Sequence, residues 1–276
     1  MNLKPIYIEA TDIPDAWFQC IYNLFDYGRK YVVQQGSFVG QTRLEFDAVT
    51  VKIKHPYNEP WDTMLPQIPT HFNIPNPVEN GYIEQYMPYL MSGEREKKES
   101  YSYGSRLNKV LLWEYIKDLF SKNISTSGRK EVYYEEDSFW EEKNIVYRDD
   151  REPGDCELPY VFLNQVELII WNFKNKGYNS NQAILQVAQP SDLIIKDPPC
   201  LRSIHVKIID NKLVFYPYFR SNDLWGGFPA NLAGIAVLQK YMADEIGVPV
   251  GEMIYFSSGL HVYGYVEEIA KLRCNK

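Results

Sequence analysis

Apolar and polar residues alternate most regularly in the second half of the chain. A period of two predicts strands over three segments, 182–190, 201–210 and 212–221. The polar run at 210–212 suits a tight turn, so the last two strands are expected to form a hairpin. Apolar residues then recur at helical spacing over 229–246, and Gly247 ends this predicted helix. The segment 252–272 is predicted to form a strand and a short C-terminal helix.

The first half of the chain has a less regular pattern. Helices are predicted over 16–27, 81–91 and 106–121. The stretch 29–56 reads as a hairpin-like pair of strands, and the proline-rich stretch 56–80 as a surface connection. The segment 165–175 suits a buried helix or a strand, and we favour the helix. Together these elements predict one α+β domain over residues 1–276, in which long helices lie on a mixed sheet and the acidic segment 122–157 is an exposed insertion.

Composition narrows the class of protein. The net charge of −7 argues against nucleic-acid binding through phosphate contacts, although a few local arginines suffice for a small anionic substrate. No apolar run reaches the roughly 20 residues of a membrane-spanning helix, and the N-terminal stretch lacks the apolar centre of a signal peptide. We therefore expect a cytoplasmic protein without a membrane partner. The four cysteines and four histidines are scattered, so neither a disulfide framework nor a metal site is predicted.

Cys200 is the candidate nucleophile. It follows Pro198 and Pro199 at the start of a predicted strand, so its backbone is held rigidly. Arg202 and Arg220 are expected to lie near it in the hairpin, where they would stabilise a thiolate. The alternative is a buried structural cysteine, because free cysteines mostly behave as small apolar residues.

The segment 219–231 offers groups that suit an anionic heterocycle. Arg220 and Ser221 together suit a phosphate, and the Asp223 carboxylate can accept hydrogen bonds from ring N–H groups. Gly227 belongs to a glycine pair that lets the backbone approach a flat ligand closely.

Three more polar side chains have two interpretations each. Asn231 is either the N-cap of the predicted helix or an amide that reads a uracil edge, since it offers one donor group and one acceptor. His261 and Tyr263 are two residues apart on a predicted strand, so they point to the same face. They form either a packed aromatic pair or a site for a hydroxyl group.

Taken in this order, these motifs resemble the thymidylate synthase family. The matching pieces are Pro199-Cys200, Arg220-Ser221-Asn222-Asp223, Gly227-Phe228-Pro229-Ala230-Asn231 and His261-Val262-Tyr263. Tyr103, in the sequence YSYG, resembles the family tyrosine that lies near the reacting base. The resemblance is strong from about residue 179 to residue 266 and faint before that, and the chain looks similar to the divergent archaeal members.

The resemblance implies a mixed, twisted β-sheet with long helices packed on it, and a homodimer formed sheet against sheet around a shared active site. It implies that the Cys200 thiolate adds to carbon 6 of a pyrimidine nucleotide, and that carbon 5 then attacks the methylene group of methylene-tetrahydrofolate or of a methanopterin analogue. It also implies the following roles: Arg220 and Ser221 bind the 5′-phosphate, Arg220 keeps the thiol ionised, Asp223 and Gly227 line the pterin site, Asn231 reads uracil, and His261 and Tyr263 bind the sugar 3′-hydroxyl.

The chain also departs from the family pattern. Asn181 and Gln182 stand where family members carry two arginines that reach the partner's phosphate site, so phosphate binding is weaker or is supplied by Arg43 or Arg202. The family's catalytic glutamate has no clear counterpart, and Glu84 is the candidate for it. The chain ends soon after the His-x-Tyr pair, where typical members continue into a tail that closes over the folate.

These departures leave three functions open. The first is reductive methylation of deoxyuridylate, dUMP, to dTMP. The second is hydroxymethylation of a pyrimidine nucleotide, in which water replaces hydride in the last step. The sequences RSND and LHVY are shared with deoxycytidylate hydroxymethylases, but those enzymes carry an aspartate in place of Asn231, so Asn231 favours uracil. The third is a nucleotide-binding relative without catalysis.

Overall fold

The computed structural model describes residues 3–95, 99–111, 146–148 and 161–276. Its largest sheet has six strands in the order β1-β4-β12-β10-β9-β8. These strands are β1 (Pro5–Ala10), β4 (Ala48–Ile53), β12 (Val250–Ser257), β10 (Lys212–Phe219), β9 (Leu201–Ile209) and β8 (Ile184–Gln186). Two of the neighbouring pairs, β1 with β4 and β10 with β12, are parallel and the other three are antiparallel. The mixed sheet and the α+β class are therefore as predicted.

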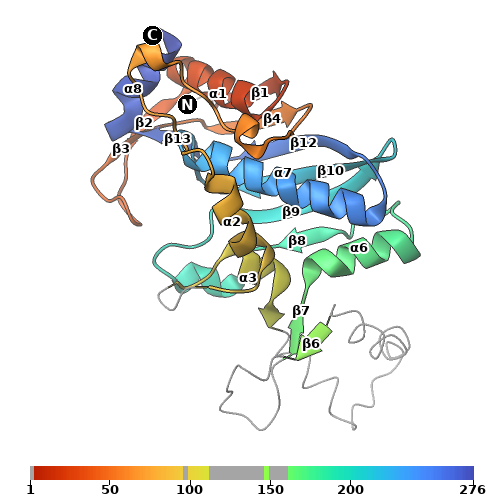
Figure 1. Cartoon of the computed structure of the whole chain (residues 1–276). Helices are drawn as coiled ribbons and strands as arrows, with labels where there is room; N and C mark the ends of the chain where they lie inside the picture. The colour runs from red at the N-terminus through yellow and green to blue at the C-terminus, as the bar shows by residue number, and fades with distance from the viewer. Residues whose placement is uncertain (1–2, 96–98, 112–145, 149–160) are drawn as a thin grey trace.

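Two smaller sheets accompany the large one. The first has the order β11-β13-β3-β2 and consists of β11 (Asn222–Asp223), β13 (Leu260–Tyr263), β3 (Thr42–Glu45) and β2 (Arg29–Val32). The second has the order β5-β7-β6 and consists of β5 (Val110–Leu111), β7 (Val161–Leu163) and β6 (Val146–Arg148). Along the chain, β11 directly follows β10 and β13 directly follows β12, and Figure 1 shows β2, β3 and β13 beside α8.

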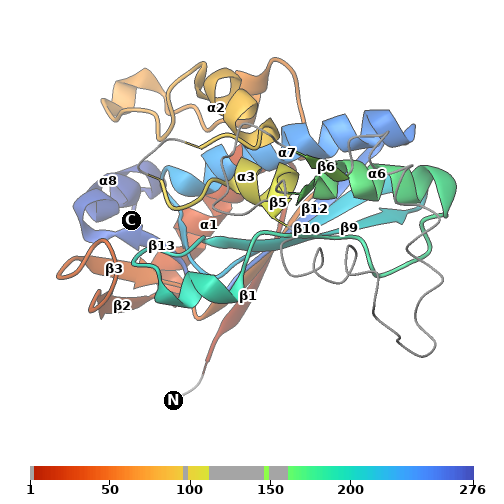
Figure 2. The ribbon, with the colours of Figure 1, turned by 90° about the horizontal axis from the view of Figure 1, so that it is seen from below.

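Helices cover one face of the large sheet (Figure 2). The described α-helices are α1 (Ile13–Tyr27), α2 (Tyr82–Met91), α3 (Tyr103–Asn108), α6 (Gln165–Asn175), α7 (Gly227–Ile246) and α8 (Gly264–Cys274). Of these, α8 packs instead on strands β13 and β3 of the small sheet. Helix α7 packs on β10 and β12 and is itself flanked by α1, α2 and α6. Short 3₁₀ helices, η1 (Trp61–Met64), η2 (Thr70–Phe72) and η3 (Pro190–Ile194), lie in the connections. None of the described helices is long and apolar enough to cross a membrane.

Local chemistry explains several element boundaries. Asp12 caps α1 by accepting a hydrogen bond from the Asp15 amide, which places the start of the helix a few residues before the predicted residue 16. Asp210 and Asn211 have positive φ angles of 49° and 59°, and they form the predicted turn between β9 and β10. Gly247 ends α7 in the left-handed conformation with a φ of 86°, as predicted. The segment 165–175 is helical, as we favoured.

Three predictions of secondary structure were wrong within the described residues. The single strand expected at the start of 252–272 is two strands, β12 and β13, which belong to different sheets. The helix predicted over 106–121 is interrupted after Asn108, because Lys109 has non-helical backbone angles and Val110 then pairs with Leu163. The rest of this prediction, beyond Leu111, lies outside the described residues. The pair of strands predicted over 29–56 is three strands, of which β4 joins the large sheet beside β1. Most of the acidic segment 122–157 lies outside the described residues, so its role as an insertion and the single-domain organisation stay predictions.

Candidate active site

Cys200 directly precedes β9, and two arginines hold the prolines in front of it. The Arg220 guanidinium donates from Nε to the Pro199 carbonyl at 3.1 Å and from Nη2 to the Pro198 carbonyl at 2.5 Å. Arg202 donates from Nη1 to the same Pro199 carbonyl at 3.2 Å. The Arg220 amide also donates to the Cys200 carbonyl at 2.9 Å. The thiol is therefore fixed in position by side chains from both strands of the β9–β10 hairpin.

Burial and neighbouring charges act on the Cys200 thiol in opposite directions. Burial raises the pKa of this thiol above its ordinary value, and the Asp197 carboxylate raises it further, whereas Arg220 and Arg202 lower it. The net direction is upward, so the thiol is protonated at neutral pH in this substrate-free arrangement. Arg220 thus favours the thiolate, but burial outweighs its effect, so the expectation that Arg220 keeps the thiol ionised is not met in this arrangement.

Two tyrosines line the other side of the thiol. The Leu201 amide, next to Cys200, donates to the Tyr103 hydroxyl at 3.2 Å. Burial, followed by the Cys200 charge, raises the pKa of Tyr103 well above its usual value. The same two causes raise the pKa of Tyr101 to about 12. Sequence reasoning singled out Tyr103 but missed Tyr101, for which the only signal was its place two residues earlier in the same YSY sequence.

The small sheet places a second set of polar residues together. The strand register sets Asp223 opposite His261, and Tyr263 opposite Arg43. The His261 and Tyr263 rings form an edge contact with their centroids 4.6 Å apart. Burial, followed by the charges of Asp223 and Cys200, raises the pKa of Tyr263 to about 12, and Arg43 opposes this effect. The Cys200 charge is therefore close enough to act on the pair of residues that was expected to bind a sugar.

The His261 ring has a defined protonation state. Its Nδ1 lies 2.9 Å from the Gly259 carbonyl, which can only accept a hydrogen bond, so Nδ1 carries the hydrogen. Burial lowers the pKa of His261, so the ring is neutral at pH 7. Nε2 is then an acceptor, and it is buried without a partner among the described residues. Such an atom is suited to accept a hydrogen bond from a ligand hydroxyl.

Arg43 is engaged by a neighbouring carboxylate. Its Nε lies 2.8 Å from the Glu45 carboxylate, and that carboxylate also lies 3.9 Å from His261 Nδ1. Burial raises the pKa of Glu45, and the Arg43 charge opposes this effect. Arg43 is thus near the candidate site, but its charge is already compensated.

Asp223 and Asn231 lie at the start of α7. The Asp223 carboxylate accepts hydrogen bonds from the amides of Trp225, Gly226 and Gly227 at 3.2–3.3 Å, so it also holds the turn that begins the helix. The interpretation of Asn231 as an N-cap is wrong, because the helix begins at Gly227. The Asn231 side chain instead donates to the Asn222 side chain at 3.4 Å, which leaves its own oxygen for a ligand.

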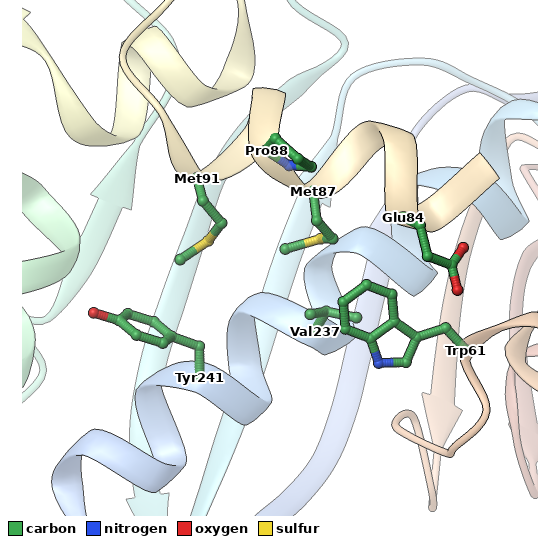
Figure 3. Close-up of a pocket in the computed structure, with 7 residues that line it drawn as sticks. All are labelled: Trp61, Glu84, Met87, Pro88, Met91, Val237 and Tyr241. Carbon is green, nitrogen blue, oxygen red and sulfur yellow. The ribbon is translucent and has the colours of Figure 1, made fainter. Parts of the chain in front are cut away.

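The structure does not bring Glu84 to this cluster. Glu84 is exposed on α2 and lines an apolar groove with Trp61, Met87 and Tyr241, as Figure 3 shows. The α2 side chain whose charge acts on Tyr103 is Tyr86, two residues further along the helix. Geometry therefore gives Glu84 no place beside Cys200.

The positions of the remaining candidate residues, Ser221, Gly227, Asn181 and Gln182, are as follows. Ser221 is half-buried directly after Arg220, and Gly227 packs so closely that an added Cβ would lie 3.1 Å from the Asn222 side-chain oxygen. Asn181 and Gln182 are exposed before β8. Among the described residues there is no group of three or more histidine, cysteine or acidic side chains that could hold a metal ion.

The sequence is similar to known proteins of one family. A family model described as thymidylate synthase matches residues 106–275. A protein of Methanosarcina mazei named "Putative thymidylate synthase" is 25% identical over 270 residues, which are 96% of this chain and 94% of that protein. A Methanothermobacter thermautotrophicus protein of the same name is 24% identical over 262 residues, 93% of this chain and 92% of its own length. A Listeria monocytogenes thymidylate synthase is 33% identical over 93 residues, 33% of this chain and 30% of that protein. The chain therefore belongs to the thymidylate synthase family, as a divergent member that resembles the archaeal proteins along nearly its whole length.

Proposed function

We propose that this protein methylates carbon 5 of deoxyuridylate, with methylene-tetrahydrofolate as donor of both the carbon and the hydride. The observation that carries the proposal is the position of the Cys200 thiol, beside backbone groups that Arg220 and Tyr103 hold by hydrogen bonds. A thiol that is only a packing residue has no need of two arginines at the carbonyls before it.

The proposed reaction begins with the loss of the Cys200 proton and the addition of Sγ to carbon 6 of the pyrimidine. Carbon 5 becomes nucleophilic and forms a bond with the methylene carbon of the donor. Loss of the carbon 5 proton and cleavage of the bond to the donor nitrogen give an exocyclic methylene group. Hydride from the reduced pterin ring completes the methyl group, Sγ leaves carbon 6, and the donor leaves as dihydrofolate.

The other residues orient the substrate in this proposal. Arg220 and Ser221 bind the 5′-phosphate, and the Asn231 amide pairs with the uracil edge. The neutral His261 ring accepts a hydrogen bond from the sugar 3′-hydroxyl at Nε2, beside the Tyr263 hydroxyl. Asp223 and Gly227 line the pterin site. Arg43 reaches the phosphate only if it leaves Glu45, so we assign it a secondary role.

The proposal includes a homodimer formed through the face of the large sheet opposite the helices. Side chains on that face include Tyr7, which is 61% exposed, and Phe256, which is 40% exposed and packs against Tyr218 with ring centroids 5.3 Å apart. No described α-helix covers this face, which carries aromatic side chains beside the Lys52–Glu252 ion pair, so it is suited to a second copy of the chain. A Phe256→Asp variant should then be monomeric in light scattering. The control is Phe72→Asp, at an exposed position in η2, and this variant should remain a dimer.

The second candidate is hydroxymethylation, in which water instead of hydride attacks the methylene intermediate. Asn222 favours keeping this candidate, because it completes the RSND sequence that the deoxycytidylate hydroxymethylases share. Product mass separates the two reactions, since a hydroxymethyl group is one oxygen heavier than a methyl group.

The test is a product assay with each of the four pyrimidine monophosphates, run with methylene-tetrahydrofolate and then with a methanopterin donor. We expect dTMP and dihydrofolate from deoxyuridylate with the first donor, no product from a Cys200→Ser variant, and full activity from the matched Cys274→Ser variant. A hydroxymethylated product without dihydrofolate would select the second candidate. Absence of product with either donor, together with no covalent trapping of 5-fluorodeoxyuridylate on Cys200, would refute both.

A further inference from the structure

Asp197 lies beside the cation to which the proposed function gives the substrate phosphate. One carboxylate oxygen of Asp197 is 3.9 Å from Arg220 Nη2. Its other oxygen accepts a hydrogen bond from the Ser37 hydroxyl at 2.9 Å. The Asp197 side chain is 64% exposed and the Arg220 side chain 36% exposed, so this ion pair lies at the mouth of the site. An oxyanion is therefore already present where a substrate oxyanion is expected.

Asp197 and a phosphate cannot share Arg220 without a cost. Arg220 directs Nε and Nη2 at the carbonyls of Pro199 and Pro198, so part of its hydrogen-bonding capacity is used within the protein. A guanidinium binds carboxylates and phosphates through the same N–H groups. Two anions a few ångströms apart also repel each other, by about 1 kcal/mol even in water-like surroundings. A phosphate that binds Arg220 therefore has to displace Asp197.

Ser37 connects this carboxylate to the other side of the site. It belongs to the loop between β2 and β3, in which Gly36 and Gly40 have positive φ angles of 95° and 88°. The next residue, Phe38, packs against Tyr263 with ring centroids 4.6 Å apart. One loop thus contacts both Asp197 beside the thiol and Tyr263 at the proposed sugar site.

We propose that Asp197 tunes the affinity of the site for the nucleotide phosphate: its carboxylate, tethered by Ser37, occupies the place of the substrate phosphate at Arg220 until a nucleotide displaces it. The inference rests on the proposed function, because it needs Arg220 to be the phosphate ligand. Its consequence is a cost that only anionic ligands bear. A nucleoside monophosphate has to move the Asp197 carboxylate into water before it gains the guanidinium, whereas an uncharged nucleoside leaves the carboxylate in place.

The test measures ligand binding without turnover. Alkylation of Cys200 by iodoacetamide is followed by mass spectrometry in wild type, Asp197→Asn and the control Asp210→Asn, with each rate normalised to the same variant without ligand. Asp210 is an exposed acid at the far end of β9, roughly 30 Å from Cys200 at about 3.3 Å per residue. The ligands are inorganic phosphate, deoxyuridine and deoxyuridylate.

We expect the concentrations of phosphate and of deoxyuridylate that give half-protection to fall about fivefold in Asp197→Asn, which is the upper end of what an exposed ion pair contributes. Deoxyuridine protection and all values of Asp210→Asn should stay as in wild type. Ser37→Ala should shift phosphate protection in the same direction by a smaller factor, because the carboxylate loses its tether.

Equal phosphate protection in Asp197→Asn and Asp210→Asn would overturn the inference, as would a shift for deoxyuridine as large as that for deoxyuridylate. No protection by phosphate in any variant would also overturn it. These outcomes are separate from those of the proposed function. A chain that forms no methylated product but shows the phosphate shift keeps an anion site governed by Asp197 and loses only the reaction.

Discussion

Replacing Asp192 by asparagine tests whether a buried ion pair supports the candidate site. The Asp192 side chain is only 1% exposed and receives Arg106 Nη2 at 2.6 Å, with Arg202 Nη1 at 3.6 Å. Asparagine keeps the shape and can still accept the Gln189 amide, which Asp192 holds at 2.8 Å. Among the described residues, Asp192 is the only acidic side chain that pairs with these two guanidiniums, so the substitution removes their counter-charge. Removing one partner of a buried pair costs about 3–5 kcal/mol, so we expect a loss of about 3 kcal/mol in the free energy of unfolding.

The matched control is Asp244→Asn. Asp244 pairs with Lys240 one helical turn away on α7 at 2.5 Å, but its side chain is 60% exposed. An exposed pair of this kind contributes about 0.5 kcal/mol. Urea unfolding followed by circular dichroism gives both values, and the Asp192 variant should also melt about 10 °C lower, at roughly 3 °C per kcal/mol for a chain of this size. If Asp192→Asn loses no more stability than Asp244→Asn, the reasoning from burial is wrong.

Three further predictions concern the site itself. Tyr103→Phe removes the acceptor of the buried Leu201 amide, so it should destabilise the fold by about 1–2 kcal/mol and slow the reaction. The control is Tyr86→Phe, because the Tyr86 hydroxyl has no hydrogen bond within the described residues, and it should cost less than half as much. Equal losses of stability in the two variants would contradict the role of the bond between Leu201 and Tyr103. Asn231→Asp should move the ratio of kcat/KM values from uracil towards cytosine nucleotides, and an unchanged ratio would refute the base-reading role. The raised pKa of Cys200 means that its alkylation rate should rise about tenfold per pH unit around neutral pH and should not level off below pH 9, and a plateau below pH 8 would show that the arginines outweigh burial.

Local patterns predicted much of the fold and failed where distant pairing decides the structure. The β9–β10 hairpin, α6, α7 and the mixed sheet follow from alternation, helical spacing and turn residues. The strand β5 could not be predicted, since Val110 is extended only because β7 pairs with it from 50 residues further along the chain. The separation of β3 and β4 into different sheets likewise depends on partners at the opposite end of the chain.

In the candidate site, too, the sequence identified some residues correctly and could not show contacts between distant segments. Motif order identified Cys200, Arg220 and the His261–Tyr263 pair, and the structure places them within electrostatic reach of one another. Glu84 was chosen from sequence alone, and the helical twist of α2 turns it away from Tyr103 while Tyr86 acts on that residue. The pairing of Asp192 with Arg106 and Arg202 was also invisible in the sequence, because tertiary packing alone brings these residues together. Arg43 and Glu45, in contrast, are two residues apart on β3 and therefore share a face of the strand.

The ion pairs around the site differ in how easily the arginine can exchange its carboxylate for a substrate anion. Three arginines are each faced by a carboxylate: Arg202 by Asp192 at 3.6 Å, Arg43 by Glu45 at 2.8 Å and Arg220 by Asp197 at 3.9 Å. The carboxylate side chains are 1%, 13% and 64% exposed, respectively. Separating a buried pair leaves an uncompensated charge away from water, whereas an exposed carboxylate is solvated as soon as it turns outward. The compensated charges are consistent with the raised pKa of Cys200, and the graded exposure makes Arg220 the arginine from which a phosphate can displace the carboxylate at least cost.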